Sequence, residues 1–220
     1  MTSSSGLTVG HVEARVHGRY LLRRAEAPAP LLIAFHGYGE AADSILDSVL
    51  ETPGVDGWHV ASVQALNRFY NRRTREVVAG WMTKQDRKLA IADNVAYVEA
   101  AVGAIVETVD LDGPIVYAGF SQGTAMTYRA AAAAGSRIAG IIALAGDVPP
   151  EIADEAGWSR PPVLIGCGTE DDWYGEARAS ADRDLLSGLG SEVELEVFDG
   201  GHVWTDAFRR AAGAFLARLR

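Results

Sequence analysis

The fold is decided by the stretch Pro114-Ile115-Val116-Tyr117-Ala118-Gly119-Phe120-Ser121-Gln122-Gly123, which leads into the alanine-rich segment 124–134. Its apolar first half predicts a buried strand, and segment 124–134 predicts a helix. A serine between two glycines at such a turn is typical of a nucleophile elbow, where the serine backbone is strained and the glycines let strand and helix pack closely. The same pentapeptide also arises by chance in glycine-rich loops, and this chain has 24 glycines. The assignment of Ser121 therefore depends on what the rest of the chain supplies.

After residue 30 the chain alternates between short apolar runs and amphipathic segments. Continuous apolar runs are typical of strands buried on both faces of a parallel sheet, and stripes with steps of three and four residues are typical of helices. The predicted strands are 31–35, 58–63, 114–118, 138–144, 163–167 and 193–198, and the predicted helices are 43–50, 86–109, 124–134, 176–186 and 202–219. This alternation predicts a doubly wound, mainly parallel sheet with helices on both faces, the α/β-hydrolase architecture.

The N-terminal part has a different pattern. Residues 8–17 alternate between apolar and polar side chains, Gly18 follows, and Tyr20 opens a second apolar run. This pattern predicts an antiparallel hairpin at the edge of the sheet. With 220 residues, the whole chain 1–220 is expected to form a single domain, in which residues 1–7 are flexible.

Composition narrows the class of protein. The net charge of −9 and the pI near 5.0 argue against nucleic acid or an anionic membrane as the main partner, and favour a cytoplasmic protein. No signal peptide and no integral membrane segment are expected from the sequence. The single cysteine, Cys167, lies in an apolar run and is expected to be a buried structural thiol. The histidines lack ligand spacing and no phosphate-binding loop is present, so we expect neither a metal nor another cofactor. The oligomeric state stays open, a homodimer included.

Three residues follow predicted strands in the order nucleophile, acid, base: Ser121, Asp171 and His202. They are separated by 50 and 31 residues, which leaves room for the chain to return to the same sheet edge, where open α/β sheets bind ligands. A serine hydroxyl is a weak nucleophile and needs a histidine to take its proton, and a carboxylate must orient that histidine. Alone, His202 could equally cap the helix that follows it; the other two residues favour catalysis.

A second glycine-rich turn, His36-Gly37-Tyr38-Gly39, follows the first buried strand. The backbone N–H groups of Tyr38 and Gln122 are the predicted oxyanion donors. We interpret His36 as structural, lying under this loop and hydrogen-bonding its backbone, rather than as catalytic.

These blocks resemble those of a known family. His36-Gly37-Tyr38-Gly39, Gly119-Phe120-Ser121-Gln122-Gly123, Gly168-Thr169-Glu170-Asp171 and Gly201-His202 look like the matching blocks of the phospholipase/carboxylesterase family of α/β-hydrolases. The resemblance runs from about residue 30 to the end and implies a small, cofactor-free serine esterase or thioesterase with little or no lid. One departure is Thr124, where the family often has a further glycine.

The resemblance also decides between neighbouring acids. Residues leaving a strand alternate in direction, so only one of Asp171 and Asp172 can face His202. The family places the acid three residues after the glycine at 168, which implies Asp171. Glu170, Asp147 and Asp199 are weaker alternatives.

The predicted reaction is hydrolysis of a small-molecule carboxylic ester, with a short to medium acyl chain, through a Ser121 acyl-enzyme. A thioesterase or lysophospholipase on the same residues, or a ligand-binding protein without turnover on a hydrolase scaffold, are the alternatives. The apolar residues of segment 64–86 recur with neither a helical nor a strand period. We interpret this segment as a pocket-lining loop, with a solvated loop as the alternative. The candidate substrate-binding aromatics are Tyr70, Trp81, Trp173 and Trp204, with Tyr38 beside them.

Overall fold

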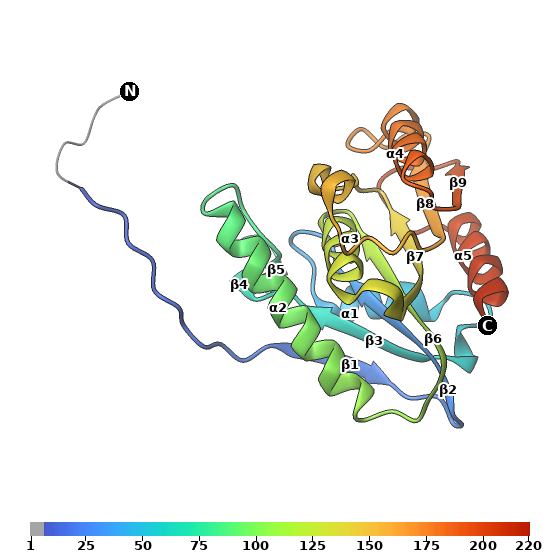
Figure 1. Cartoon of the computed structure of the whole chain (residues 1–220), viewed down its shortest axis with the longest axis horizontal. Helices are drawn as coiled ribbons and strands as arrows, with labels where there is room; N and C mark the ends of the chain where they lie inside the picture. Colours follow the sequence, from blue (N-terminus) through green and yellow to red (C-terminus); the bar gives the residue numbers. More distant parts are fainter. Residues whose placement is uncertain (1–6) are drawn as a thin grey trace.

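The computed structural model describes residues 7–220 (Figure 1). Its main sheet has seven strands in the order β1-β3-β2-β6-β7-β8-β9. All neighbouring pairs are parallel except β1 and β3, which are antiparallel. The strands are β1 (Arg19–Arg23), β2 (Ala29–Phe35), β3 (His59–Gln64), β6 (Leu111–Phe120), β7 (Ile138–Leu144), β8 (Val163–Gly168) and β9 (Val193–Phe198). The predicted fold class, a mainly parallel α/β-hydrolase sheet with an antiparallel pair at its N-terminal edge, is confirmed.

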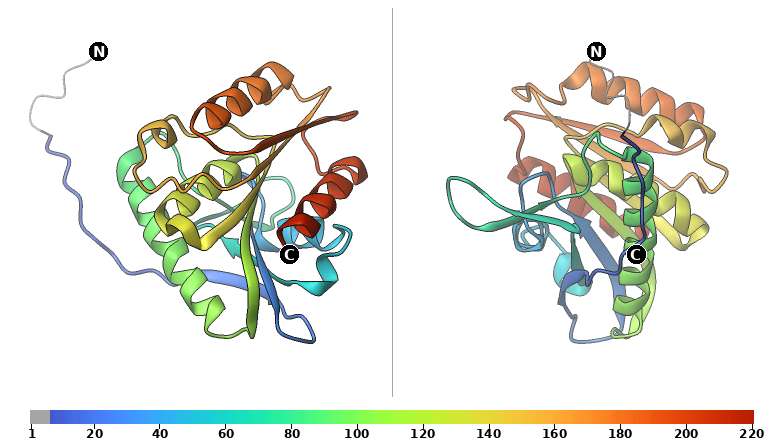
Figure 2. Two further views of the ribbon diagram at one scale, coloured as in Figure 1. Left: turned by 45° about the vertical axis from the view of Figure 1, so that its right-hand side comes forward. Right: turned by 90° about the vertical axis from the view of Figure 1, so that its left-hand side faces the viewer.

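Five helices cover the two faces of the sheet (Figures 1 and 2). They are α1 (Ala42–Leu50), α2 (Arg87–Val106), α3 (Gln122–Ala134), α4 (Glu176–Gly188) and α5 (Asp206–Leu219), joined by the short 3-10 turns η1 (Val55–Gly57), η2 (Gly135–Arg137) and η3 (Pro150–Asp154). Apolar side chains of α2, α3 and α4 form one core with the sheet, and those of α1 and α5 form a second core on the opposite face.

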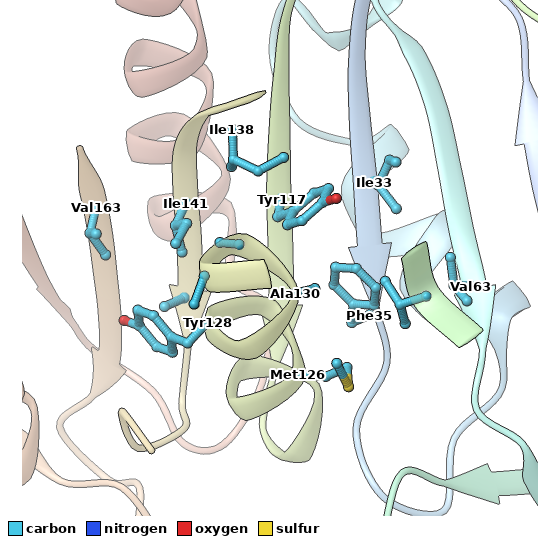
Figure 3. Close-up of a cluster of buried hydrophobic side chains, with 14 of the residues drawn as sticks. Ile33, Phe35, Val63, Tyr117, Met126, Tyr128, Ala130, Ile138, Ile141 and Val163 are labelled. Carbon is cyan, nitrogen blue, oxygen red and sulfur yellow. The ribbon is translucent and has the colours of Figure 1, made fainter. Parts of the chain in front are cut away.

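The first core is centred on Phe35 and Tyr117, from the adjacent strands β2 and β6 (Figure 3). Their rings meet edge to face with centroids 5.4 Å apart, and Phe35 meets Trp81 in the same way at 5.7 Å. Burying a phenylalanine side chain of this kind contributes about 1.5–3 kcal/mol. The carboxyl end of β6, where Ser121 follows, is thereby fixed against its neighbours.

The predicted strand at residues 8–17 is not formed. Residues 7–17 are exposed and have no regular structure, and Val12 is 91% exposed; in Figure 1 this segment runs away from the body of the protein. The antiparallel partner of β1 is β3, with Tyr20 opposite Val63. Gly18 does not turn the chain back; it packs directly against the ring of Tyr97, whose hydroxyl accepts the backbone N–H of Arg19 and donates to its carbonyl oxygen. The prediction that residues 1–7 are flexible falls, apart from Leu7, outside the described residues.

The segment expected to be a loop contains a second, two-stranded sheet. Strands β4 (Asn67–Tyr70) and β5 (Val77–Gly80) form an antiparallel hairpin, which projects from the body in the right-hand view of Figure 2. Its free end is exposed, while Ala79 at its base is fully buried. The hairpin therefore joins the body at residues 79–82.

Helix α2 has the length and apolar composition of a membrane span, with a hydropathy of 1.6 over 18 residues. The sequence predicts no integral membrane segment. Here the helix packs on the sheet beside α3, with Val98, Ala101 and Ile105 in the first core. Of this 18-residue window, 28% is buried, and length and composition alone are weak evidence for a membrane span.

Candidate active site

Ser121 lies at the turn between β6 and α3 with a backbone conformation that side chains rarely adopt, φ 53° and ψ −119°. A Cβ atom at Gly119 would overlap the hydroxyl of Thr127, and one at Gly123 would overlap the carbonyl oxygen of Phe35. Both glycines are thus required by close packing, as the motif predicts. The turn is also fixed from the neighbouring strand, because the backbone N–H of Ser121 donates to the carbonyl oxygen of Leu144 at 2.9 Å.

Thr124 is accommodated in this turn by a glycine on the facing loop. Its side chain is fully buried, and its hydroxyl donates to the carbonyl oxygen of Leu144 at 3.1 Å. Gly146 faces it: a Cβ there would lie 2.8 Å from the Thr124 Cβ and would overlap the Ser121 carbonyl oxygen. The elbow therefore keeps its close packing with a threonine at this position.

The structure brings Asp171 and His202 into contact. Oδ2 of Asp171 lies 2.8 Å from Nδ1 of His202, while Oδ1 accepts the backbone N–H groups of Trp173 at 2.8 Å and Tyr174 at 2.9 Å. Burial raises the pKa of Asp171, but these two N–H groups and His202 outweigh burial and hold that pKa below its usual range. Asp171 is thus ionised at neutral pH and fixes the orientation of the imidazole. Asp172 is exposed.

The loops after β8 and β9 hold these two residues together. The backbone N–H of Thr169 donates to Phe198 at 2.9 Å, and that of Glu170 donates to Gly200 at 2.8 Å. On its other side, the His202 ring lies 4.9 Å from the Phe120 ring, next to Ser121. Ser121 and His202 line the same cavity, although within residues 7–220 no hydrogen bond joins their side chains.

His36 lies beneath the loop that carries Tyr38, as predicted. Its Nδ1–H donates to the carbonyl oxygen of Gly37 at 2.7 Å, and its Nε2 accepts the backbone N–H of Ala65 at 3.0 Å. Burial lowers the pKa of His36, and the N–H that it accepts requires the neutral ring. The structural interpretation of His36 is confirmed.

Residues 79–82, at the base of the β4–β5 hairpin, bind the loop that carries Tyr38. The backbone N–H of Gly39 donates to Ala79 at 2.9 Å, and the N–H of Ala79 donates to Glu40 at 2.8 Å. The indole Nε1–H of Trp81 donates to the carbonyl oxygen of His36 at 2.8 Å.

The same segment also binds Gln122. The backbone N–H of Trp81 donates to Oε1 of Gln122 at 2.7 Å, and Nε2 of Gln122 donates to Met82 at 2.9 Å. The two predicted oxyanion donors are therefore held by one piece of chain. Among the hydrogen bonds of the described residues, none is donated by the backbone N–H of Tyr38 or of Gln122.

A cavity of about 550 Å³ contains Ser121 and His202, and Tyr38 and Gln122 also line it. Trp173 also lines it and is 78% exposed. Three arginines that the sequence analysis did not single out also line it: Arg87, Arg129 and Arg178.

The other three predicted aromatics do not line this cavity, which corrects the sequence analysis. Trp81 is fully buried behind the loop that carries Tyr38. Trp204 packs against Phe208, with ring centroids 5.2 Å apart, in the core under α5. Tyr70 is 65% exposed on the hairpin. The sequence shows that these residues are aromatic and near a strand end, but not which way each side chain points.

Two further features bear on ligands. A mostly apolar cavity of about 380 Å³ between α2, α3 and the amino end of β6 contains none of the predicted site residues. Within the part of the chain that the structure describes, no group of three or more His, Cys, Asp or Glu side chains could hold a metal ion.

The family model of phospholipases and carboxylesterases matches residues 21–219. The chain belongs to this family. Members of this family are hydrolases of the phospholipase and carboxylesterase type, and the predicted resemblance is confirmed. No curated protein matches the chain.

Solved structures show the same fold. Esterase PE8 has a TM-score of 0.76 at 20% identity, over 93% of this chain and 100% of that one. A phospholipase/carboxylesterase from Dyadobacter fermentans DSM 18053 has a TM-score of 0.71 at 19% identity, covering 94% and 100%. Acyl-protein thioesterase 2 from Zea mays has a TM-score of 0.66 at 18% identity, covering 92% and 99%. At these identities the likeness establishes the fold alone.

Proposed function

We propose that the protein hydrolyses carboxylic esters through an acyl-enzyme on Ser121, with Asp171 and His202 completing a catalytic triad. The observation that carries the proposal is the 2.8 Å hydrogen bond between Asp171 and His202. His202 lines the same cavity as Ser121, whose backbone has a φ of 53°. Strained backbone of this kind persists where the surrounding structure enforces it, and it is frequent at active sites.

In the first half-reaction, the Ser121 hydroxyl attacks the ester carbonyl carbon and His202 accepts the hydroxyl proton. The carbonyl oxygen becomes an oxyanion, which the N–H groups of Tyr38 and Gln122 would stabilise; one such donor is worth about 3 kcal/mol. The tetrahedral centre collapses, the alcohol leaves with the proton from His202, and the acyl group stays on Ser121. Asp171 keeps the imidazole in the required tautomer throughout and stabilises its charged form.

In the second half-reaction, water takes the place of the alcohol. His202 accepts a proton from the water, the resulting hydroxide attacks the acyl-enzyme, and the carboxylic acid leaves as Ser121 recovers its proton. The cavity of about 550 Å³ supports a substrate with a short to medium acyl chain. Thioesters and lysophospholipids would use the same residues, and the maize relative is named as a thioesterase.

A serine-directed phosphonate tests this proposal. It should label the chain once, and Ser121→Ala should lose both the label and the turnover of an activated ester such as p-nitrophenyl butyrate. Ser44→Ala, an exposed position in α1, is the matched control and should keep both. Labelling that persists in Ser121→Ala would show that another residue is the nucleophile. Stoichiometric binding without product release in the wild type would favour the ligand-binding alternative.

A further inference from the structure

Helix α3 directs one of its faces into the catalytic cavity. Ala125 and Arg129 lie four residues apart on α3, Ser121 immediately precedes the helix, and all three line the cavity. Residues four apart lie on the same face of a helix, and eight residues span about 12 Å along its axis. Arg129 therefore lies along the cavity wall from Ser121. Its side chain is only 4% exposed.

The charge of this wall differs in sign from that of the whole protein. Arg87, Arg129 and Arg178 line the cavity, and among the described residues Asp147 is the only acidic residue that lines it, with its Oδ1 3.5 Å from Nη1 of Arg178. The chain as a whole has a net charge of −9. A concave surface with an excess of one sign attracts ligands of the opposite sign.

Arg129 keeps hydrogen-bond donors for a ligand. Its Nε and Nη2 donate to Oε1 of Glu151 at 2.8 and 2.7 Å. Its Nη1 is 3.7 Å from the sulfur of Met82, a weak acceptor, and within residues 7–220 it has no oxygen partner. Burial lowers the pKa of Arg129, with Glu151 opposing this effect, and an arginine remains charged in proteins even so. A charged donor with little solvent contact binds an anion more strongly than an exposed one.

We propose that Arg129 makes this enzyme selective for esters that carry an anionic group, a carboxylate or a phosphate, on the part of the substrate that lies along α3. The anion would accept hydrogen bonds from Nη1 of Arg129. The more exposed Arg87 and Arg178 would add a smaller share of the positive potential, because Glu151 lies 3.8 Å from Arg87 and Asp147 lies 3.5 Å from Arg178. Glu151 competes with the ligand for Arg129 and sets the strength of the preference. This inference rests on the proposed esterase function and adds a substrate class to it.

The experiment compares matched esters in the same protein. One arm uses mono-p-nitrophenyl esters of dicarboxylic acids from glutarate to suberate, each paired with its methyl-capped neutral form, and p-nitrophenyl phosphonoalkanoates of similar length. A second arm uses 4-acetoxybenzoate and its neutral methyl ester, which place the charge on the alcohol. The readout is the ratio of kcat/KM for the anionic and neutral members of a pair. This ratio is independent of the fraction of folded enzyme, so a variant that folds poorly is still informative.

In the wild type we expect a ratio of about ten or more at the best chain length, since hydrogen bonds to charged groups are worth that factor or more. Arg129→Gln should reduce the ratio to near one, and Arg129→Lys should retain part of it. Glu151→Gln should raise the ratio, because it releases Nε and Nη2 of Arg129. Arg183→Gln, at an arginine on α4 that is paired with the adjacent Asp184, should leave the ratio within about twofold.

A preference in the first arm would place the anionic group on the acyl part of the substrate, and a preference in the second arm would place it on the alcohol part. Comparing the carboxylate series with the phosphonate series identifies the preferred anion. Ser121-dependent turnover of neutral esters with a ratio near or below one in every pair would overturn the inference and leave the esterase function intact. A ratio unchanged by Arg129→Gln would overturn the role of Arg129. Absence of Ser121-dependent turnover of all esters would overturn the esterase function, and this inference with it.

Discussion

At the scale of single residues, the environment of Asp171 distinguishes it from its neighbour. Its carboxylate is buried and receives the backbone N–H groups of Trp173 and Tyr174 in addition to His202. Because these partners lower its pKa in the folded state, they stabilise the protein above the pKa of the unfolded chain, and this stability is lost as pH falls through the folded pKa. Asp172 points to solvent.

We therefore predict that Asp171→Asn lowers kcat by several orders of magnitude, as far as about 10⁴-fold in the serine-protease template, because the amide no longer enforces the required tautomer of His202. Steady-state kinetics with an activated ester measure the loss. Asp172→Asn is the matched control and should lose less than about tenfold, since it removes only an exposed charge. The reverse ranking of the two variants would identify Asp172 as the acid.

Motif residues could be predicted from the sequence because each depends on local backbone geometry. Gly119 and Gly123 have no room for a Cβ, so the elbow requires glycines that can be recognised in the sequence. The arginines that line the cavity belong to no such motif. Arg129 could have been found from its helical spacing with Ser121, but Arg87 and Arg178 reach the cavity from separate elements, and only the tertiary structure shows this.

At the scale of elements, the β4–β5 hairpin connects the two predicted oxyanion donors. Its strands are only four residues each, and all of β4 is exposed; β5 is an apolar run, but it is too short by itself to predict a hairpin. The hairpin is held at its base by contacts that are distant in sequence, such as the pairing of Ala79 with Glu40. Long apolar strands such as β2 and β7 were predicted because their burial on both faces leaves a continuous apolar run. In residues 8–17 the prediction fails for the opposite reason: the sequence alternates as in a strand, but the segment pairs with no other strand.

The Gln122 side chain is expected to position the oxyanion donors through this hairpin. Gln122→Glu keeps the acceptor for the N–H of Trp81 but places a carboxylate against the carbonyl oxygen of Met82. We predict that kcat falls by about tenfold or more with little change in KM, because a displaced donor weakens binding of the transition state and not of the ground state.

Measured kcat and KM, together with the affinity for a trifluoromethyl ketone that mimics the tetrahedral intermediate, test this role. The inhibitor should lose affinity in parallel with kcat. Arg73→Ala, at the exposed end of the hairpin, should leave both unchanged. A rise in KM at constant kcat in Gln122→Glu would instead show that the side chain contributes uniform substrate binding.

At the scale of the whole molecule, loops from separate parts of the sheet meet around the cavity, and Asp182 on α4 joins two of them. Its Oδ2 accepts the backbone N–H of Val148 at 3.0 Å and the hydroxyl of Tyr174 at 2.8 Å. Both of these residues line the cavity. Burial raises the pKa of Asp182, and Asp147 adds to this effect, while Val148 and Tyr174 oppose it. The cavity rim is therefore built around a carboxyl group whose charged form is disfavoured by folding.

This arrangement gives a signed prediction for stability. A carboxyl group with a raised pKa binds its proton more tightly in the folded state, so its contribution is fully present below the unfolded pKa and is lost as pH rises through the folded pKa. Asp182→Asn keeps an oxygen acceptor for Val148 and Tyr174 and cannot ionise. We predict that its free energy of unfolding, relative to the wild type, increases as pH rises from about 4 toward 7, because the wild-type group loses its proton in that direction.

Urea unfolding at a series of pH values measures this difference. Asp184→Asn, at an exposed position two residues further along α4, should show no comparable trend. If Asp182→Asn instead loses stability relative to the wild type as pH rises, the ionised carboxylate is the favoured form in the folded protein, and its bonds to Val148 and Tyr174 outweigh burial.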